Sequence, residues 1–166
     1  MVDVDLVSVG MVEETASVIL VLRAASLARV LVMEVGLMEG RAIALEAEGV
    51  KTPRPLTHEL THRIMDALGG TLTRVVICDY RDRTFFANLE LQTADGREVL
   101  VDARPSDALA LALRTGVPIV ATEEVLEAAG FSEEELEGDL EEELEEEEAP
   151  DGGEKEGDEG DGHVLH

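Results

Sequence analysis

The hydrophobic pattern begins with three segments of strand character. Residues 4–12, 17–22 and 29–35 carry alternating or continuous β-branched runs, and short polar turns separate them. A helix over residues 38–48 follows, because Gly49 provides a C-terminal stop. This part of the chain therefore predicts three strands and one helix.

An amphipathic helix is predicted over residues 57–68, and the pair Gly69-Gly70 ends it. Its apolar residues recur at helical spacing and fall on one side of the helix. They are Leu56, Leu60, Ile64, Ala67 and Leu68. Strands are predicted next over residues 71–79 and 83–93. The turn Ala94-Asp95-Gly96 leads into a partner strand over residues 98–103, which completes a hairpin.

A helix made almost wholly of Ala and Leu is predicted over residues 108–113, with Ser106 as its N-cap and Gly116 as its stop. A helix that is apolar all round has to be buried on most sides. A short strand over residues 117–121 and a last helix over 123–129 complete the pattern. Thr122 caps that helix, Gly130 stops it, and Phe131 is placed to pack back onto it.

Two strand-helix units share a weak sequence similarity. Residues 29–32 precede an Ala-rich helix with Ala42-Ile43-Ala44-Leu45, and residues 98–101 precede Ala108-Leu109-Ala110-Leu111. We interpret the pair as a duplication in which small residues bring helices close to a sheet. Chance similarity between Ala/Leu-rich segments is the alternative.

Composition indicates the kind of core, and the order of the predicted elements indicates the fold class. Hydrophobic residues make up 45% of the 166 positions, but the chain has no Trp, one Tyr and three Phe, so the core is aliphatic. A chain of this length suits one domain. Strands and helices in this order predict an α+β class. Cys78 is the single cysteine, which excludes an internal disulfide.

The net charge of −25 is unevenly distributed. Residues 133–166 hold 18 of the 38 acidic residues and one base, Lys155, so we predict a folded domain over 1–131 and a disordered acidic tail over 132–166. A surface this acidic excludes a general basic footprint for nucleic acid, and any phosphate-binding site has to be local. Ser132 is expected to cap a helical turn.

The sequence has no apolar run long enough for a membrane helix, and its N-terminus carries acid where a signal peptide carries base. A cytoplasmic protein without a membrane partner is therefore expected. Glycine-rich nucleotide-binding loops are also missing from the sequence, which disfavours nucleotide-dependent chemistry.

Two segments each combine Arg, Pro and a helix start. They are Pro53-Arg54-Pro55-Leu56-Thr57-His58 and Asp102-Ala103-Arg104-Pro105-Ser106-Asp107. Free N–H groups at a helix N-terminus, together with a guanidinium, hold a phosphate well. Ordinary helix capping is the competing interpretation, because Pro and Ser are common at helix starts for structural reasons alone.

Residues His58-Glu59-Leu60-Thr61-His62 also match the His-Glu-x-x-His signature of zinc proteases. Both imidazoles would share one helix face, with Glu59 as the base. No third His follows before His163 and His166, although Glu or Asp can serve as the third ligand. A solvated helix face with exposed pairs Glu59–Arg63 and His62–Asp66 is the favoured alternative.

The chain resembles the bifunctional nuclease family over about residues 2–128. The resemblance is carried by Pro-Arg-Pro-Leu-Thr-His-Glu-Leu at residues 53–60 and by Val-Asp-Ala-Arg-Pro-Ser-Asp-Ala-Leu-Ala-Leu-Ala at 101–112, and it continues through 114–119. It implies a single α+β domain with a curved mixed sheet and about four helices, a homodimer or higher homo-oligomer, and nuclease activity on DNA and RNA.

The residues that match this resemblance supply candidate roles in phosphodiester hydrolysis. We expect His58, Glu59 and Asp107 to act in catalysis, and Arg54, Arg104 and Ser106 to bind substrate phosphate. Hard carboxylates suit a Mg²⁺-like ion, for which Asp102, Asp107 and Glu59 are the candidate ligands. A non-catalytic oligomeric binding module is the alternative function, because the acidic domain and tail create an adverse field for a polyanionic substrate.

Overall fold

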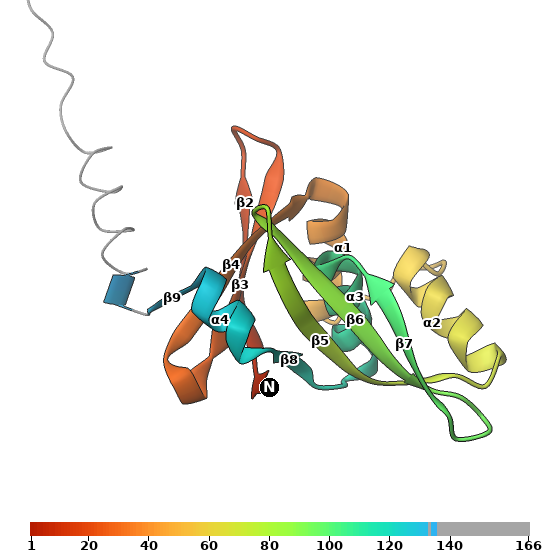
Figure 1. The fold of residues 1–166 in the computed structure, drawn as a ribbon. Helices are drawn as coiled ribbons and strands as arrows, with labels where there is room; N and C mark the ends of the chain where they lie inside the picture. Colours follow the sequence, from red (N-terminus) through yellow and green to blue (C-terminus); the bar gives the residue numbers. More distant parts are fainter. Residues whose placement is uncertain (133, 136–166) are drawn as a thin grey trace, which may run out of the picture.

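The computed structural model describes residues 1–132 and 134–135, and the predicted acidic tail lies almost entirely outside these residues. Figure 1 shows an α+β architecture, which confirms the predicted class. The described strands form one five-stranded and one four-stranded sheet, accompanied by four α-helices. The bounds of most elements fall within three residues of the predicted ones.

The four-stranded sheet has the order β2-β3-β4-β9 and is antiparallel throughout. Its strands are β2 (Asp5–Val12), β3 (Ser17–Ala24), β4 (Arg29–Gly36) and β9 (Gly130–Ser132). The central strand β3 buries Leu20 and Leu22 completely, as its apolar run predicts. A single 3₁₀ turn, η1 (Ala25–Leu27), joins β3 to β4.

The five-stranded sheet has the order β1-β8-β5-β6-β7. Its strands are β1 (Val2–Asp3), β8 (Ile119–Ala121), β5 (Thr71–Arg81), β6 (Thr84–Gln92) and β7 (Glu98–Ala103). Strands β5 and β8 are parallel and the other pairs are antiparallel, so this sheet is mixed. The mixed sheet implied by the family resemblance is therefore present, together with a second sheet.

The predicted first strand is divided between the two sheets. The chain pairs with β8 at Val2 and Asp3, and then with β3 from Asp5 onward. Val4, between the two strands, is buried, and its N–H donates to the carbonyl of Ile119. The N-terminus therefore ties one sheet to the other.

Helices α1 (Leu37–Ala47) and α3 (Pro105–Thr115) join the layers. Helix α1 packs on β3 and β4, α3 packs on β5 and β6, and the two helices pack on each other. Gly40 of α1 allows this closeness, because a Cβ there would lie 2.3 Å from Cβ of Val18. As predicted, α3 is buried along most of its length.

The two strand-helix units of the sequence similarity, β4-α1 and β7-α3, both exist. They occupy different positions, because β4 is an inner strand of its sheet and β7 is an edge strand. The shared feature is local: in each unit a small-residue helix follows the strand directly and lies against the other unit's helix.

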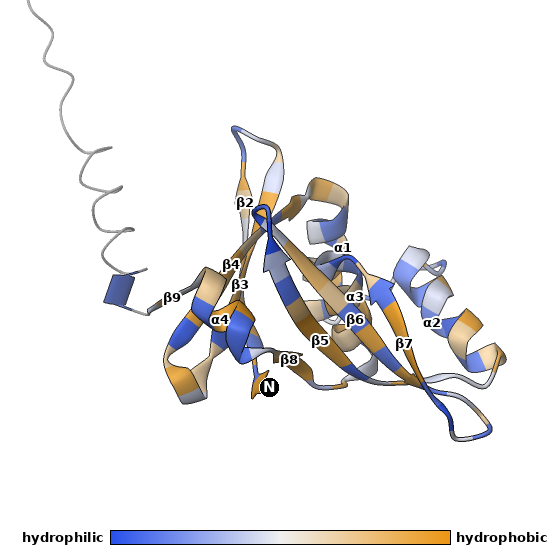
Figure 2. Cartoon of the chain, in the orientation of Figure 1, coloured by the Kyte–Doolittle hydropathy of each residue, from blue (hydrophilic) through white to orange (hydrophobic). Residues whose placement is uncertain are grey.

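Helix α2 (Thr57–Ala67) lies outside this core and contacts α3. None of its residues is buried, and the apolar side predicted from the sequence faces outward. Leu60 and Ile64 are 51% and 50% exposed, and Leu68 beyond the helix is 81% exposed. The edge strand β7 also exposes Val99, Leu100 and Val101. Figure 2 shows these apolar segments on α2 and β7.

Three local predictions differ from the structure. Ser106 is not a cap: α3 begins at Pro105, whose fixed φ suits the first helical position, so Arg104 becomes the N-cap and Ser106 lies inside the first turn. Phe131 does not return to its helix but pairs with Val30 through β9, and it is 42% exposed. The first strand is split, as described above.

The last helix, α4 (Glu123–Ala129), begins as predicted, because the Thr122 hydroxyl accepts a hydrogen bond from Val125 N–H. Ser132 also acts as predicted. Its hydroxyl accepts from Glu135 N–H, and the Glu135 carboxylate accepts from Ser132 N–H, which is a capping box. Among the described residues, no helix is long and apolar enough to cross a membrane.

Candidate functional site

The two Arg-Pro segments meet in a cleft between helices α1, α2 and α3, which we call the helix cleft. Pro55 to His58 line one wall of this cleft, and Arg104 and Asp107 line another; its volume is about 490 Å³. His58 Nε2 lies 2.9 Å from Asp107 Oδ1, and this contact joins α2 to α3. The structure thus brings His58, Arg104 and Asp107 of the two segments together in one cleft.

Local sequence positions both members of the pair. Asp107 lies in the first turn of α3, where a carboxylate complements the helix dipole. His58 lies in the first turn of α2, and its side chain is 14% exposed. An ionised Asp107 can only accept a hydrogen bond, so the proton of a neutral imidazole resides on Nε2. His58 Nδ1 is then the nitrogen that can accept a proton.

Arg104 completes the group. Its Nε and Nη2 donate to the two oxygens of Asp107 at 2.7 and 3.0 Å, and its Nη1 donates to Glu39 at 3.0 Å. The hydrogen bonds from Arg104 hold the pKa of the Asp107 carboxyl below its usual range, and His58 adds to this effect against an opposing contribution from burial. Hydrogen bonds to the carboxylates of Asp107 and Glu39 raise the pKa of Arg104.

Glu59 points to a different group of charges. Its carboxylate pairs with Arg63 on α2 and with Arg114 on α3, the latter at 3.4 Å. Arg114 also pairs with Glu46 on α1. Arg114 thus ties the three helices together through Glu46 and Glu59, and Glu59 is not part of the helix cleft. Arg114 and Glu39 were not recognised as site residues in the sequence, because their partners lie far away along the chain.

The zinc-protease interpretation finds no support in the described part of the chain. His58 bonds Asp107, while His62 Nε2 lies 3.5 Å from Asp66. Both pairs of the alternative interpretation, Glu59–Arg63 and His62–Asp66, are present, although the Glu59 and His62 side chains are only 18% and 30% exposed. No cluster of three or more His, Cys, Asp or Glu suited to a metal occurs within these residues, and His163 and His166 lie outside them.

The expected Mg²⁺ ligands do not lie close together either. Asp107 lines the helix cleft, Asp102 lines a neighbouring cavity, and Glu59 is held by arginines. The three carboxylates therefore do not form one cluster. Arg54 is exposed, and its guanidinium has no ion pair with any described residue and lines neither cavity. Residues 55–58 of the same segment reach the helix cleft, but Arg54 itself does not.

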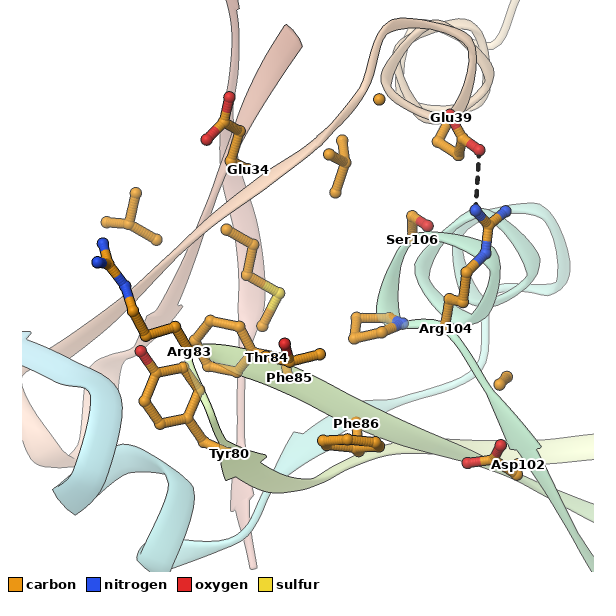
Figure 3. A pocket seen from close by; sticks show the side chains of 16 residues that line it. Glu34, Glu39, Tyr80, Arg83, Thr84, Phe85, Phe86, Asp102, Arg104 and Ser106 are labelled. Atoms are coloured by element: carbon orange, nitrogen blue, oxygen red, sulfur yellow. Dashed lines mark hydrogen bonds and ion pairs between the residues drawn. The ribbon is translucent and has the colours of Figure 1, made fainter.

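The neighbouring cavity, which we call the sheet cavity, opens between β4, the β5-β6 hairpin and the start of α3. Its volume is about 760 Å³. Figure 3 shows Tyr80, Phe85 and Phe86 on one side, and Ser106 and Arg104 on the opposite side. Arg104 and Glu39 also line the helix cleft, so this ion pair forms the shared wall of the two cavities.

Fold and site together define an α+β domain with a His-Asp pair and an arginine at the N-terminus of a buried helix. The model of the bifunctional nuclease domain matches residues 20–134, and the chain belongs to this family. The sequence is also 47% identical over 113 residues to the Mycobacterium tuberculosis proteins named "Uncharacterized protein MT1877" and "Uncharacterized protein Rv1829". The match covers 68% of this chain and 66% of each relative.

Proposed function

We propose that the protein is a nuclease that hydrolyses phosphodiester bonds of DNA and RNA without strong sequence specificity. The observation that carries this proposal is the 2.9 Å contact between His58 and Asp107 in a cleft that also contains Arg104. A base, a residue that orients it and a cation for the phosphate are the parts that such hydrolysis requires. The family's description as a nuclease domain supports the same conclusion.

In the proposed reaction, Nδ1 of His58 accepts a proton from a water molecule as the water oxygen attacks phosphorus. One P–O bond forms, the bond to the leaving oxygen breaks, and the imidazolium then returns the proton to that oxygen. Asp107 keeps the imidazole in the Nε2–H tautomer and stabilises the imidazolium, and Arg104 offsets the negative charge on the phosphoryl oxygens.

The surrounding carboxylates set a limit on substrate affinity. Arg104 already bonds Asp107 and Glu39, so a phosphate has to compete with Glu39 for Nη1.

Mg²⁺ is often bound by one or two carboxylates together with substrate phosphates, and we include dependence on this ion in the proposal. No catalytic step is assigned to it, because the candidate carboxylates do not share one cavity.

Digestion of single-stranded DNA, duplex DNA and RNA by purified protein, in Mg²⁺ and in EDTA, tests the proposal. Arg104→Ala is expected to lower the cleavage rate about 100-fold or more, as for other groups that stabilise transition-state charge. Arg97→Ala serves as the control, because Arg97 lies at the exposed β6-β7 turn. Equal rates for the Arg104 variant and wild type would contradict the assignment.

We also propose that the chain forms a homodimer or higher homo-oligomer through α2 and β7. Leu56, Leu60 and Ile64 form an exposed apolar stripe, and β7 presents an unpaired edge with apolar side chains. Such surfaces also fit the alternative function, a non-catalytic oligomeric module. That function would be favoured by an intact oligomer without cleavage activity.

A further inference from the structure

We propose that the sheet cavity binds one nucleotide unit of a single-stranded nucleic acid, with its base against the aromatic side and its phosphate at the start of α3. This inference rests on the proposed nuclease function and specifies its substrate: a strand whose bases are free to leave the stack. The cavity volume of about 760 Å³ is in the range of small-molecule sites.

The aromatic side provides the surface for a base. Tyr80 and Phe85 form one ring pair, with centroids 4.6 Å apart. Phe86 is also in the lining, but it alternates with Phe85 along β6, and the Arg81 guanidinium lies over its ring, 4.3 Å from the centroid. These three rings comprise all aromatic residues of the chain except Phe131. Stacking of bases on aromatic rings tolerates any sequence, because every base has a π face. The cavity therefore suits a nuclease without strong specificity.

The opposite side provides groups for a phosphate. Ser106 is only 6% exposed, it lines the cavity, and its hydroxyl makes no hydrogen bond to any residue that the structure describes. Its oxygen is not one of the buried unpaired side-chain atoms of the described residues, so the hydroxyl is open to the cavity and can donate to an oxygen acceptor of a ligand. The α3 N-terminus has no side-chain cap, so its first-turn N–H groups add positive dipole at the same place.

Arg83 is an exposed residue of the cavity lining. It lies in the β5-β6 turn with φ of +58°, next to Asp82 with φ of +51°. Non-glycine residues rarely adopt this left-handed conformation. In the structure, the turn places the Arg83 side chain in the cavity lining beside Tyr80, where a second phosphate of a strand can approach.

The shared wall connects this cavity to the hydrolytic group. Arg104 and Glu39 line both cavities, so a phosphate held near Ser106 and Arg104 is adjacent to the cleft that contains His58 and Asp107. Duplex bases are paired inside the helix and cannot reach the aromatic side without being extruded. Single strands are therefore expected to bind better than duplexes of the same sequence.

Charge restricts the ligand further. The cavity lining contains the two arginines 83 and 104, and the three carboxylates of Glu34, Glu39 and Asp102, of which Glu39 is paired with Arg104. A nucleoside triphosphate would place several negative charges among these acids. One base with the single charge of a phosphodiester matches the lining better.

Tyr80 is the only tyrosine, and the chain has no Trp, so its fluorescence reports on this cavity directly. The test titrates a phosphorothioate single strand, which resists cleavage, into the full-length protein. N-acetyltyrosinamide controls for light absorbed by the bases. Saturable quenching by the single strand, and at least about fivefold weaker apparent binding for the duplex, are expected. Absence of saturable quenching by the single strand would overturn the inference, as would equal quenching by the duplex.

Variants locate the bound base. Phe85→Leu keeps an apolar side chain but removes the π face beside Tyr80, and is expected to weaken binding about fivefold or more. Leu27→Ala, on the exposed η1 turn, is the matched control and should bind as wild type does. Unchanged affinity in a folded Phe85 variant would contradict the aromatic site. Quenching without cleavage would refute only the nuclease proposal, and cleavage without quenching would refute only the base site.

Discussion

Replacing Asp107 by Asn tests how the His58–Asp107–Arg104 group is held together. The amide keeps the size of the side chain but loses the charge that receives two hydrogen bonds from Arg104 and one from His58. Arg104 is 64% exposed, so its share is that of a solvent-screened ion pair, about 0.5 kcal/mol. The less exposed His58 contact contributes about 1 kcal/mol.

The expected loss of unfolding free energy at neutral pH is therefore about 1.5 kcal/mol, which corresponds to a melting temperature lower by roughly 5 °C for a domain of this size. The sign of the pH dependence follows from the lowered pKa of Asp107. A carboxylate with a depressed folded-state pKa contributes stability above its unfolded pKa of about 4, and this stability is lost as pH falls through the folded value.

Urea denaturation of wild type and Asp107→Asn between pH 7 and pH 3 measures this difference. The two free energies are expected to differ by about 1.5 kcal/mol at pH 7 and to converge toward pH 3. The cleavage rate of the variant is expected to fall about 100-fold or more, because His58 loses the group that fixes its tautomer. A stability gap that stays constant over this pH range would refute the proposed ionic role of Asp107.

Three further predictions concern packing, assembly and the metal. Gly40→Ala is expected to destabilise the domain by about 1–3 kcal/mol through its clash with Val18, whereas Gly10→Ala, with no atom within 4 Å of its Cβ position, should be tolerated in thermal melts. Leu60→Glu should lower the mass measured by light scattering relative to Met11→Glu, and equal masses would exclude α2 as the contact. EDTA should abolish digestion and Mg²⁺ should restore it, as for an ion held by one carboxylate together with the substrate phosphate; full activity in EDTA would exclude a metal role.

Much of the fold could be predicted from local pattern. The apolar runs of β3 and β5, the Thr122 cap of α4 and the all-apolar α3 each depend on short-range propensity and burial, and each is present as predicted. Pairing between segments that are distant in the sequence was harder to predict. The short strand β9 exists because Gly130 to Ser132 meets the edge of β4, about a hundred residues earlier. No local signal encodes that contact.

In the candidate site, too, local features could be predicted and long-range contacts could not. Pro before a helix start indicated that His58 and Asp107 lie in first turns, where both are found. The contacts of Arg104 with Glu39 and of Arg114 with Glu59 could not be predicted, because they depend on how the helices pack. The packing of α1 depends in turn on Gly40 fitting beside Val18. The outward direction of Arg54 likewise follows from tertiary structure, because only residues 55–58 of its segment contact the cleft.

The apolar side of α2 was the least predictable feature. Leu56, Leu60 and Ile64 have the spacing of a core-facing helix, yet this face is exposed in the single chain. Periodicity indicates that a face will be covered, but it does not identify the covering surface. A second copy of the chain is the occupant that we propose.

The most direct measurement of the central claim is the initial rate at which His58→Asn cleaves a labelled single-stranded oligonucleotide. His62→Asn is the matched control, because it removes the other imidazole of the same helix, which pairs with Asp66 and not with Asp107. The His58 variant should lose at least about 100-fold in rate while the His62 variant retains the wild-type rate. Comparable rates for wild type and the His58 variant would contradict the claim that the His58–Asp107 pair is the hydrolytic centre.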